Sequence, residues 1–259
     1  MGRRLGQHFL ARKSILRQIA EVCATDSGGE QVVVEIGPGK GALTEELLAL
    51  AGKVIAIEVD PVLVHYLRQR FAEAVAAGKL TLIEGDILKI DIGSLSARPV
   101  IAGNLPYYIT SPILEKIFAL RGAWESAVFL VQSEVAARLA ATPGTRDFGY
   151  LSVLAQVHAR VELLLDVPRD AFRPPPKVDS AVARLTPLPL ETADMGGFLR
   201  FAQLCFRHKR KTLRNNLTAA YSKDRVDELA EARRRAEQLS VAELMALYEK
   251  LSGHAANSR

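Results

Sequence analysis

The chain has 259 residues, of which 49% are hydrophobic and 24% charged, and its formal net charge is +5. A chain of this length and composition can bury a core without disulfides. Its start lacks the apolar segment of a signal peptide, and no apolar run reaches the roughly 18–20 residues that cross a bilayer. Cys23 and Cys205 lie in no metal-ligand spacing. These features argue against a membrane protein, a disulfide-stabilised domain and a metal site, and they predict a cytoplasmic protein.

Positive charge is concentrated in two segments that lack acidic residues. The first lies before Glu21, and the second lies between Asp194 and Asp224. Such segments suit a polyanionic partner, although solvated helix faces would give the same pattern. In the second segment, the residues expected to contact nucleic acid are Arg207, Lys209, Arg210, Lys211 and Arg214.

The first two thirds of the chain alternate strand-like and helix-like segments. Short β-branched runs predict strands at 31–36, 53–58, 80–84, 99–103, 127–132 and 161–167. Apolar residues at helical spacing predict helices at 41–50, 61–77, 111–120, 133–141 and 149–158. Asp60 is a good N-cap ahead of Pro61, and Gly78 follows the end of that helix. The alternation predicts a mostly parallel sheet with helices on both faces.

The last third of the chain changes to helices alone. Three consecutive prolines at 174–176 require an extended loop, and residues 180–185 alternate like a late antiparallel strand. Pro187 and Pro189 mark a linker, after which helices are expected at 196–206, 209–221, 224–234 and 240–251. The expected fold is α/β, with a Rossmann-like sheet in residues 1–189 and a small all-α domain in residues 190–259.

A glycine-rich turn follows the first strand and begins a helix. Its spacing, with Gly37, Gly39 and Gly41, differs from the dinucleotide fingerprint and from the phosphate-binding P-loop. Glu58 ends the next strand, about twenty residues further on, where a carboxylate can accept the ribose hydroxyls of a nucleoside. Asp86 follows the third strand and can accept from an adenine amine. Either acid could simply cap a helix, but together they predict an adenosine-binding crevice, with NAD as a rival ligand.

The tetrad Asn104-Leu105-Pro106-Tyr107 follows the fourth strand and is typical of methyltransferases that act on amines. Adenine N6 is a poor nucleophile because its lone pair is delocalised into the ring. The Asn104 side-chain oxygen and the Leu105 carbonyl can accept its two N–H groups and hold the amine towards a methyl donor. Pro106 fixes the turn, and Tyr107 offers a face for stacking. The alternative interpretation of the tetrad is an ordinary turn with Tyr107 in the core. As a methyltransferase motif, the tetrad argues against NAD as the ligand of the crevice.

Phe172 precedes the proline loop and is a candidate second aromatic wall for the target base. A loop made rigid by three prolines could carry the ring over the site. A base held between two aromatic walls has to be unstacked from its own helix. Composition alone would place Phe172 in the core.

These motifs resemble those of the ribosomal RNA adenine N6,N6-dimethyltransferases of the kasugamycin-sensitivity type. The matching segments are LGQHFL at 5–10, VEIGPGKGALT at 34–44, EGD at 84–86, NLPYYITSPIL at 104–114, VFLVQSEVAARL at 128–139, FRPPPKVDSAVARL at 172–185 and FRHKRKTLRNNL at 206–217. The resemblance implies a class I methyltransferase domain in residues 1–189 and a helical rRNA-binding domain in residues 190–259. It also implies S-adenosylmethionine as cofactor, S-adenosylhomocysteine as product and no metal.

The resemblance further implies roles for single residues. His8 and Leu10 match the segment that closes over the cofactor, although many relatives carry Asn where this chain has His8. The other positions expected to bind the cofactor are Gly37, Gly39, Glu58, Asp86 and Asn104. The positions expected to hold and stack the target base are Asn104, Leu105, Tyr107 and Phe172.

The resemblance also implies the substrate. The family dimethylates two adjacent adenosines in the hairpin loop near the 3′ end of 16S rRNA, within a nearly assembled 30S particle. The expected partner is therefore small-subunit rRNA, whose phosphates the basic residues of 207–214 would neutralise. The expected state of the protein is a monomer.

Three alternatives remain. A resistance methylase of large-subunit rRNA shares the fold and a similar tetrad, but the segments at 167–182 and 209–217 favour the small-subunit type. A mitochondrial transcription factor of the same fold would carry an Arg-rich presequence. A non-catalytic assembly factor would not need an intact tetrad.

Overall fold

The computed structural model describes residues 8–25, 32–106, 109–189 and 194–253. Its packing divides the chain into two compact units, Met1–Ala136 with Ala159–Leu188 and Ala137–His158 with Pro189–Arg259. The sequence analysis placed residues 137–158 in the first domain. The structure groups them with the C-terminal helices because Phe148, Val153 and Val157 share one buried apolar cluster with Phe198 and Leu247.

The first unit contains a seven-stranded sheet. Its strands are β2 (Val32–Ile36), β3 (Lys53–Glu58), β4 (Leu80–Glu84), β5 (Val100–Asn104), β6 (Ser126–Gln132), β7 (Ala159–Val167) and β9 (Ser180–Pro187). They lie in the order β4-β3-β2-β5-β6-β9-β7. Neighbours from β4 to β6 are parallel, and β9 is antiparallel to both β6 and β7. The predicted mostly parallel sheet with a late antiparallel strand is confirmed.

Helices precede or connect these strands. They are α1 (Lys13–Thr25), α2 (Ala42–Leu50), α3 (Pro61–Arg70), α4 (Ala72–Ala76), α5 (Thr110–Phe118) and α6 (Ser133–Leu139). The single helix predicted at 61–77 is divided at Phe71, whose backbone leaves the helical region. Helix α1 is missing from the predicted elements, although its buried residues have helical spacing, at Ile15, Leu16, Ile19, Ala20 and Cys23.

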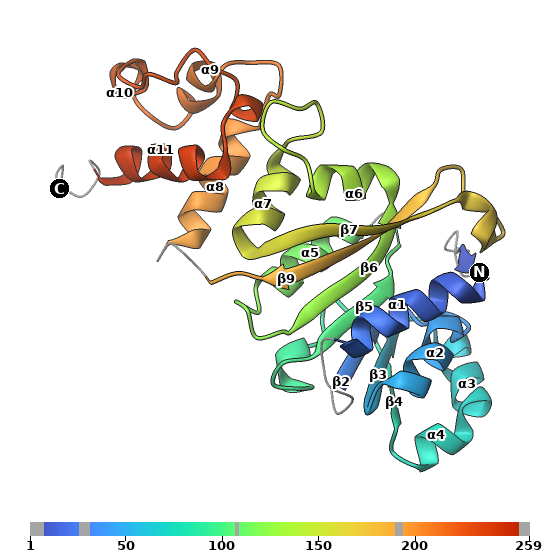
Figure 1. The fold of residues 1–259 in the computed structure, drawn as a ribbon. Coiled ribbons are helices and arrows are strands. Elements are labelled where there is room, and N and C mark those ends of the chain that lie inside the picture. The colour runs from blue at the N-terminus through green and yellow to red at the C-terminus, as the bar shows by residue number, and fades with distance from the viewer. Residues whose placement is uncertain (1–7, 26–31, 107–108, 190–193, 254–259) are drawn as a thin grey trace. The chain divides into compact units, whose positions relative to one another are not determined.

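Both faces of the central strands of the sheet are buried. Val33 and Val100 point into an apolar cluster with α1 and α2, which lie side by side (Figure 1). Their neighbours Val34 and Ile101 alternate to the other face and are also buried. Strands covered on both faces form continuous apolar runs, which is why the sequence pattern predicted them.

A separate two-stranded sheet holds the first described residues. Strand β1 (Phe9–Leu10) pairs antiparallel with β8 (Phe172–Arg173). The Ala11 N–H donates to the Ala171 carbonyl at 2.8 Å, and the next residue, Arg12, forms an ion pair with Asp170 at 2.9 Å. The chain around residues 8–12 is therefore fixed against the segment 170–174.

The second unit consists of helices around its own apolar core. They are α7 (Tyr150–His158), α8 (Met195–Cys205), α9 (Leu213–Leu217), α10 (Lys223–Asp227) and α11 (Val241–Gly253). The helices predicted at 209–221 and 224–234 are each shortened to five residues. Helix α9 begins only at Leu213, because the N–H groups of Leu213 and Arg214 bond to the carbonyls of Arg234 and Ala232.

Candidate active site

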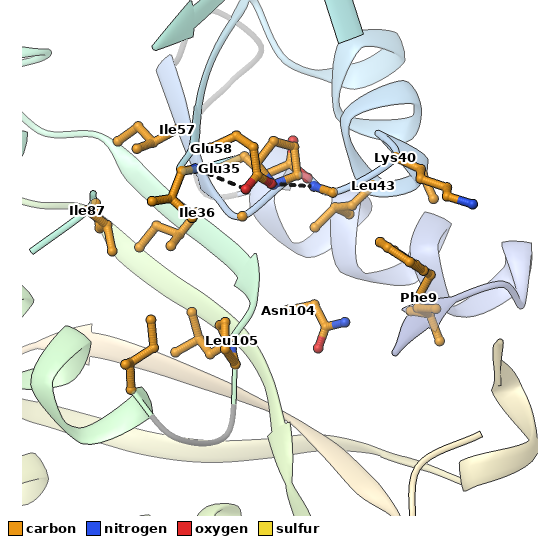
Figure 2. Close-up of a pocket in the computed structure, with 18 of the residues that line it drawn as sticks. Phe9, Glu35, Ile36, Lys40, Leu43, Ile57, Glu58, Ile87, Asn104 and Leu105 are labelled. Atoms are coloured by element: carbon orange, nitrogen blue, oxygen red, sulfur yellow. Dashed lines mark hydrogen bonds between the residues drawn. The ribbon is translucent and has the colours of Figure 1, made fainter. Parts of the chain in front are cut away.

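The carboxyl ends of β2, β3, β4 and β5 border a cavity of about 510 Å³ in the first unit. Because the carboxyl ends of parallel strands meet at one edge of a sheet, residues distant in sequence come together there. Figure 2 shows Glu35 and Glu58 on one side of the cavity and Asn104 and Leu105 on the other. The predicted site residues that line the cavity are His8, Leu10, Gly37, Gly39, Glu58, Asp86, Asn104 and Leu105.

Two glycines of the turn after β2 are required for different reasons. Gly37 has a φ of +66°, and a Cβ added there would meet nothing within 4 Å, so the turn leaves open space beside the cavity. Gly39 has a φ of +59°, and a Cβ added there would lie 2.8 Å from Cε1 of Phe9. Glycine alone combines this conformation with such a close approach. The Phe9 ring therefore packs on the turn, with the Lys40 ammonium 5.3 Å from the ring centroid.

The Glu58 carboxylate at the end of β3 is 3% exposed and holds the glycine turn in place. Oε2 accepts a hydrogen bond from the Gly39 N–H at 3.1 Å. Oε1 accepts from the N–H groups of Val59 at 2.9 Å and Asp60 at 3.1 Å. A carboxylate has about four lone-pair positions, so one remains, on Oε2. Glu58 thus has a structural role in addition to the predicted ligand contact.

Asp86 follows β4 and caps the next turn. Its Oδ1 accepts from the Leu88 N–H at 3.0 Å, and the residue lines the cavity. Its second oxygen has no hydrogen bond to any residue that the structure describes. Asp86 therefore has the capping role that the sequence allowed, and it keeps one oxygen for a ligand.

A third acid, Glu35, lines the cavity from β2 and is 1% exposed. Its Oε2 accepts from the Thr44 hydroxyl at 2.6 Å. Burial raises the pKa of Glu35 to about 7; the Thr44 hydrogen bond opposes this shift, and the charge of Glu58 adds to it. The pKa of Glu35 therefore lies close to neutral pH, where the residue can gain or lose a proton.

We expect the free energy of unfolding to fall as the pH rises from about 5 to 7 because of Glu35. The unfolded chain loses this proton near the ordinary carboxyl pKa, whereas the folded protein keeps it until about pH 7. Protonation of Glu35 thus stabilises the folded state at about pH 5. This contribution to the free energy of unfolding, about 3 kcal/mol, is lost as the pH rises through about 7. Glu35→Gln should remove the dependence while keeping an acceptor for Thr44. Denaturant titrations of both proteins across this range measure it, and parallel profiles would contradict the assignment.

The side-chain amide of Asn104, at the end of β5, has a defined orientation. Its Nδ2 donates to the main-chain carbonyl of His8 at 3.0 Å. Oδ1 is therefore the end that can accept a bond from a ligand. The Leu105 N–H donates to the Leu130 carbonyl at 3.0 Å, which attaches the tetrad to β6. Tyr107, also predicted for this site, lies outside the described residues.

Phe172 does not line the cavity. Its side chain is fully buried in the apolar cluster that includes Leu10, its partner in the β1–β8 sheet. In this structure the ring has no exposed face for a base, and its role as a second aromatic wall stays a prediction. Its packing instead secures β1 on β8. Pairing with a strand about 160 residues away in sequence could not be foreseen from the proline loop alone.

The five basic residues predicted to contact RNA differ in whether their side chains bind other residues of the second unit. The Arg214 guanidinium binds Asp227, with Nη2 2.9 Å from Oδ2, and this hydrogen bond raises the pKa of Arg214 and lowers that of Asp227. Lys209 Nζ donates to the Arg146 carbonyl. The remaining three side chains are exposed and make no ion pair or hydrogen bond with any described residue; they are Arg207, Arg210 and Lys211.

Apolar residues that the sequence analysis did not single out complete the cavity lining. They include Phe9, Ile36, Ile57, Val59, Ile87 and Ile109. Most of them are sequence neighbours of a predicted site residue, and this proximity was the only sign in the sequence that they line the cavity. Within the described residues, no three His, Cys, Asp or Glu side chains are grouped as a metal site would require. None of the described helices has the length and apolar character to cross a membrane.

Comparison with known proteins identifies the family. A family model described as "Ribosomal RNA adenine dimethylase" matches residues 2–252. The chain is 47% identical to the ribosomal RNA small subunit methyltransferase A of Acidobacterium capsulatum, over 96% of this chain and 90% of that protein. It is 39% identical to the protein of the same name from Legionella pneumophila, over 96% of this chain and 97% of that protein.

Two solved structures share the fold over nearly the whole chain. A dimethyladenosine transferase from Plasmodium falciparum has a TM-score of 0.80 at 26% identity, covering 96% of this chain and 98% of that one. The 23S rRNA methyltransferase ErmE has a TM-score of 0.68 at 27% identity, covering 94% of this chain and 99% of that one. The chain therefore belongs to the ribosomal RNA adenine dimethylase family, and it is an rRNA adenine methyltransferase with a class I fold.

Proposed function

We propose that this enzyme dimethylates N6 of two adjacent adenosines in the 3′-terminal hairpin loop of 16S rRNA, using S-adenosylmethionine, late in small-subunit assembly. The observation that carries the proposal is the Asn104 Oδ1 acceptor, which shares one cavity with the acids and the glycine turn. The names of the curated relatives support the small subunit as substrate, and the motif resemblance supports the hairpin. The proposed partner is a nearly assembled 30S particle, and the enzyme acts as a monomer in the cytoplasm.

The cavity suits S-adenosylmethionine better than NAD. Its described lining includes the carboxylates of Glu58 and Asp86, beside Glu35 with its pKa of about 7, but only one ammonium group, that of Lys40. This excess of acids favours a cofactor that carries a sulfonium and an ammonium, and it opposes a pyrophosphate. The open space at Gly37 leaves room for a ligand against the turn. S-adenosylmethionine supplies an electrophilic methyl group when bound, and no metal is required.

The lining residues have distinct binding roles in this proposal. Glu58 accepts from the ribose through the remaining position on Oε2, and Asp86 accepts from the adenine amine of the cofactor. The turn at Gly37 and Gly39 brings the backbone close to the cofactor. The segment from His8 to Leu10 closes the cavity beside them.

Asn104 acts on the target base. In the first transfer, its Oδ1 accepts one N–H of adenine N6 and the Leu105 carbonyl accepts the other, which favours a tetrahedral nitrogen with its lone pair towards the methyl group. Tyr107 stacks on the base. The methylated amine is acidic enough to lose its proton to water, so no strong base is needed.

Charge reversal at Arg210 and Lys211 should weaken the binding of small subunits and flatten its salt dependence. Both side chains are exposed, so each can neutralise a phosphate and release a counterion. Replacing both with Glu should reduce the slope of log K against log salt by about 1.5. Binding titrations over a range of salt concentrations measure the slope, and an unchanged slope would remove these two residues from the RNA surface.

Arg214→Gln is the matched control for the charge reversal. Its guanidinium already binds Asp227, so its loss should cost little RNA affinity and leave the salt slope nearly unchanged. A slope as flat as that of the double reversal would mean that Arg214 exchanges Asp227 for a phosphate when RNA binds.

Methyl transfer to ribosomal subunits tests the proposed function directly. Labelled S-adenosylmethionine is supplied with purified small and large subunits that lack their adenine methyl groups, and the product is identified after nuclease digestion. Dimethyladenosine from the small subunit is the expected result. Label confined to the large subunit would assign the enzyme to the resistance methylases, and label in neither would favour an assembly factor.

A further inference from the structure

One short segment, His8–Phe9, contacts both sides of the cavity. The His8 carbonyl accepts the bond from Asn104 Nδ2 at 3.0 Å, on the side proposed for the target amine. The Phe9 ring packs on the glycine turn, so closely that a Cβ on Gly39 would lie 2.8 Å from it. Figure 2 shows Phe9 between Asn104 and the Lys40 end of the turn. Two adjacent residues therefore connect the target-amine acceptor to the cofactor loop.

The β8 segment holds His8–Phe9 from outside the cavity. The His8 Nδ1 lies 2.9 Å from the Pro174 carbonyl, and because a carbonyl only accepts, this ring nitrogen carries the proton. Leu10 pairs with the buried Phe172. These contacts on both sides give the peptide between His8 and Phe9 a fixed direction, so its carbonyl has a defined place relative to Asn104.

The direction of this carbonyl decides what Asn104 can bind. The two ends of an asparagine amide are nearly equal in shape, so rotation by a half turn exchanges an acceptor for a donor. Turned with its NH₂ group towards adenine N6, Asn104 would present a donor to a donor and could not accept the N6 hydrogen. The His8 carbonyl binds only the NH₂ end, and it thereby leaves Oδ1 for the amine.

We propose that the His8 main-chain carbonyl is the positioning group for Asn104. The contact of Phe9 with the glycine turn fixes the position of this carbonyl. The place of the target-amine acceptor thereby depends on the contact between Phe9 and the turn. The same contact therefore serves both the cofactor side and the target side of the cavity. The inference rests on the proposed function for the identity of the cofactor and the target.

Phe9→Ala tests the link through kinetics. The variant keeps the His8 carbonyl but removes the ring that spaces it from Gly39. We expect kcat on small subunits to fall about tenfold, the effect of one weakened hydrogen bond, with KM for subunits changed less than about twofold. Phe9→Leu keeps an apolar contact and should recover most of kcat. An equal loss of kcat in both variants would overturn the spacing role of the ring.

Phe71→Ala is the matched control because the Phe71 ring packs on the same turn at Gly41. A Cβ added at Gly41 would lie 2.5 Å from the Phe71 ring, and this ring lies at the end of α3. Its loss should loosen the turn and weaken S-adenosylmethionine binding. The orientation of Asn104 should be affected far less than in Phe9→Ala, because the His8–Phe9 contacts are retained.

Side-chain amide resonances report the positioning without any substrate. In protein labelled with ¹⁵N-asparagine, the Asn104 pair is identified by its disappearance in Asn104→Ser. Phe9→Ala should shift this pair and speed its hydrogen exchange about tenfold, the change expected when a hydrogen bond of ordinary strength is lost. Phe9→Leu and Phe71→Ala should leave it near its original position. Unmoved Asn104 resonances in folded Phe9→Ala would overturn the inference, even if the wild-type enzyme methylates small subunits. Absence of methylation by wild type would instead overturn the proposed function.

Discussion

Asn104→Ala should remove most methyl transfer while S-adenosylmethionine binds nearly as well as to the wild-type enzyme. The substitution deletes Oδ1, the acceptor that the His8 bond leaves for the target amine. Loss of one such preorganised group costs about 10²- to 10³-fold in kcat. The acids and the glycine turn, which carry the proposed cofactor contacts, are unchanged. Calorimetry for the cofactor and labelled transfer to small subunits measure the two effects separately.

Asn104→Asp is the informative companion to Asn104→Ala. A carboxylate keeps oxygen acceptors for the amine but has no N–H for the His8 carbonyl. We expect its activity to lie between those of wild type and Asn104→Ala. If Asn104→Ala instead lost cofactor affinity and transfer to the same degree, the division of roles across the cavity would be refuted.

The largest effect on cofactor affinity is expected from Glu58→Ala. It removes the proposed ribose acceptor and leaves the N–H groups of Gly39, Val59 and Asp60 without their carboxylate partner. The unpaired Gly39 N–H is buried and therefore costly, and the glycine turn loses its fixed shape. We expect the Kd of S-adenosylmethionine to rise about 100-fold, with a lower melting temperature. Calorimetry and thermal unfolding measure the two changes.

Asp60→Ala separates a binding role of Glu58 from general destabilisation. Asp60 caps α3 by accepting from the Val62 N–H at 2.9 Å, and it does not line the cavity. Loss of the cap should lower stability by about 1 kcal/mol and leave cofactor affinity unchanged. An unchanged affinity in Glu58→Ala would sink the ribose role of that residue.

The site was predictable from sequence where its residues follow buried strands. Glu58, Asp86 and Asn104 each lie at or just beyond the end of a β-branched run, and parallel pairing carries such ends to one edge of the sheet. The sheet itself was predictable for the same reason, since strands buried on both faces form continuous apolar segments. The local sequence pattern was sufficient to predict these site residues because the strand that precedes each one determines its position.

Features that depend on distant partners could not be predicted in this way. The burial of Phe172 depends on pairing with β1, and the engagement of Arg214 depends on Asp227. The amide orientation of Asn104 depends on a main-chain carbonyl that carries no sequence pattern at all. Helix α7 has the apolar spacing of a sheet-covering helix, and only packing assigns it to the second unit.

The division of the chain into interleaved units has a consequence for its biosynthesis and for its dissection. The polypeptide enters the second unit at residue 137, returns to the first at 159 and leaves it again after 188. The segment 137–158 therefore emerges from the ribosome well before the helices that cover Phe148, Val153 and Val157, and it must wait for them. A chain ended near residue 189 would keep these apolar side chains without their cover, so a fragment cut at that linker should aggregate. A catalytic fragment would need residues 137–158 replaced by a short polar connection.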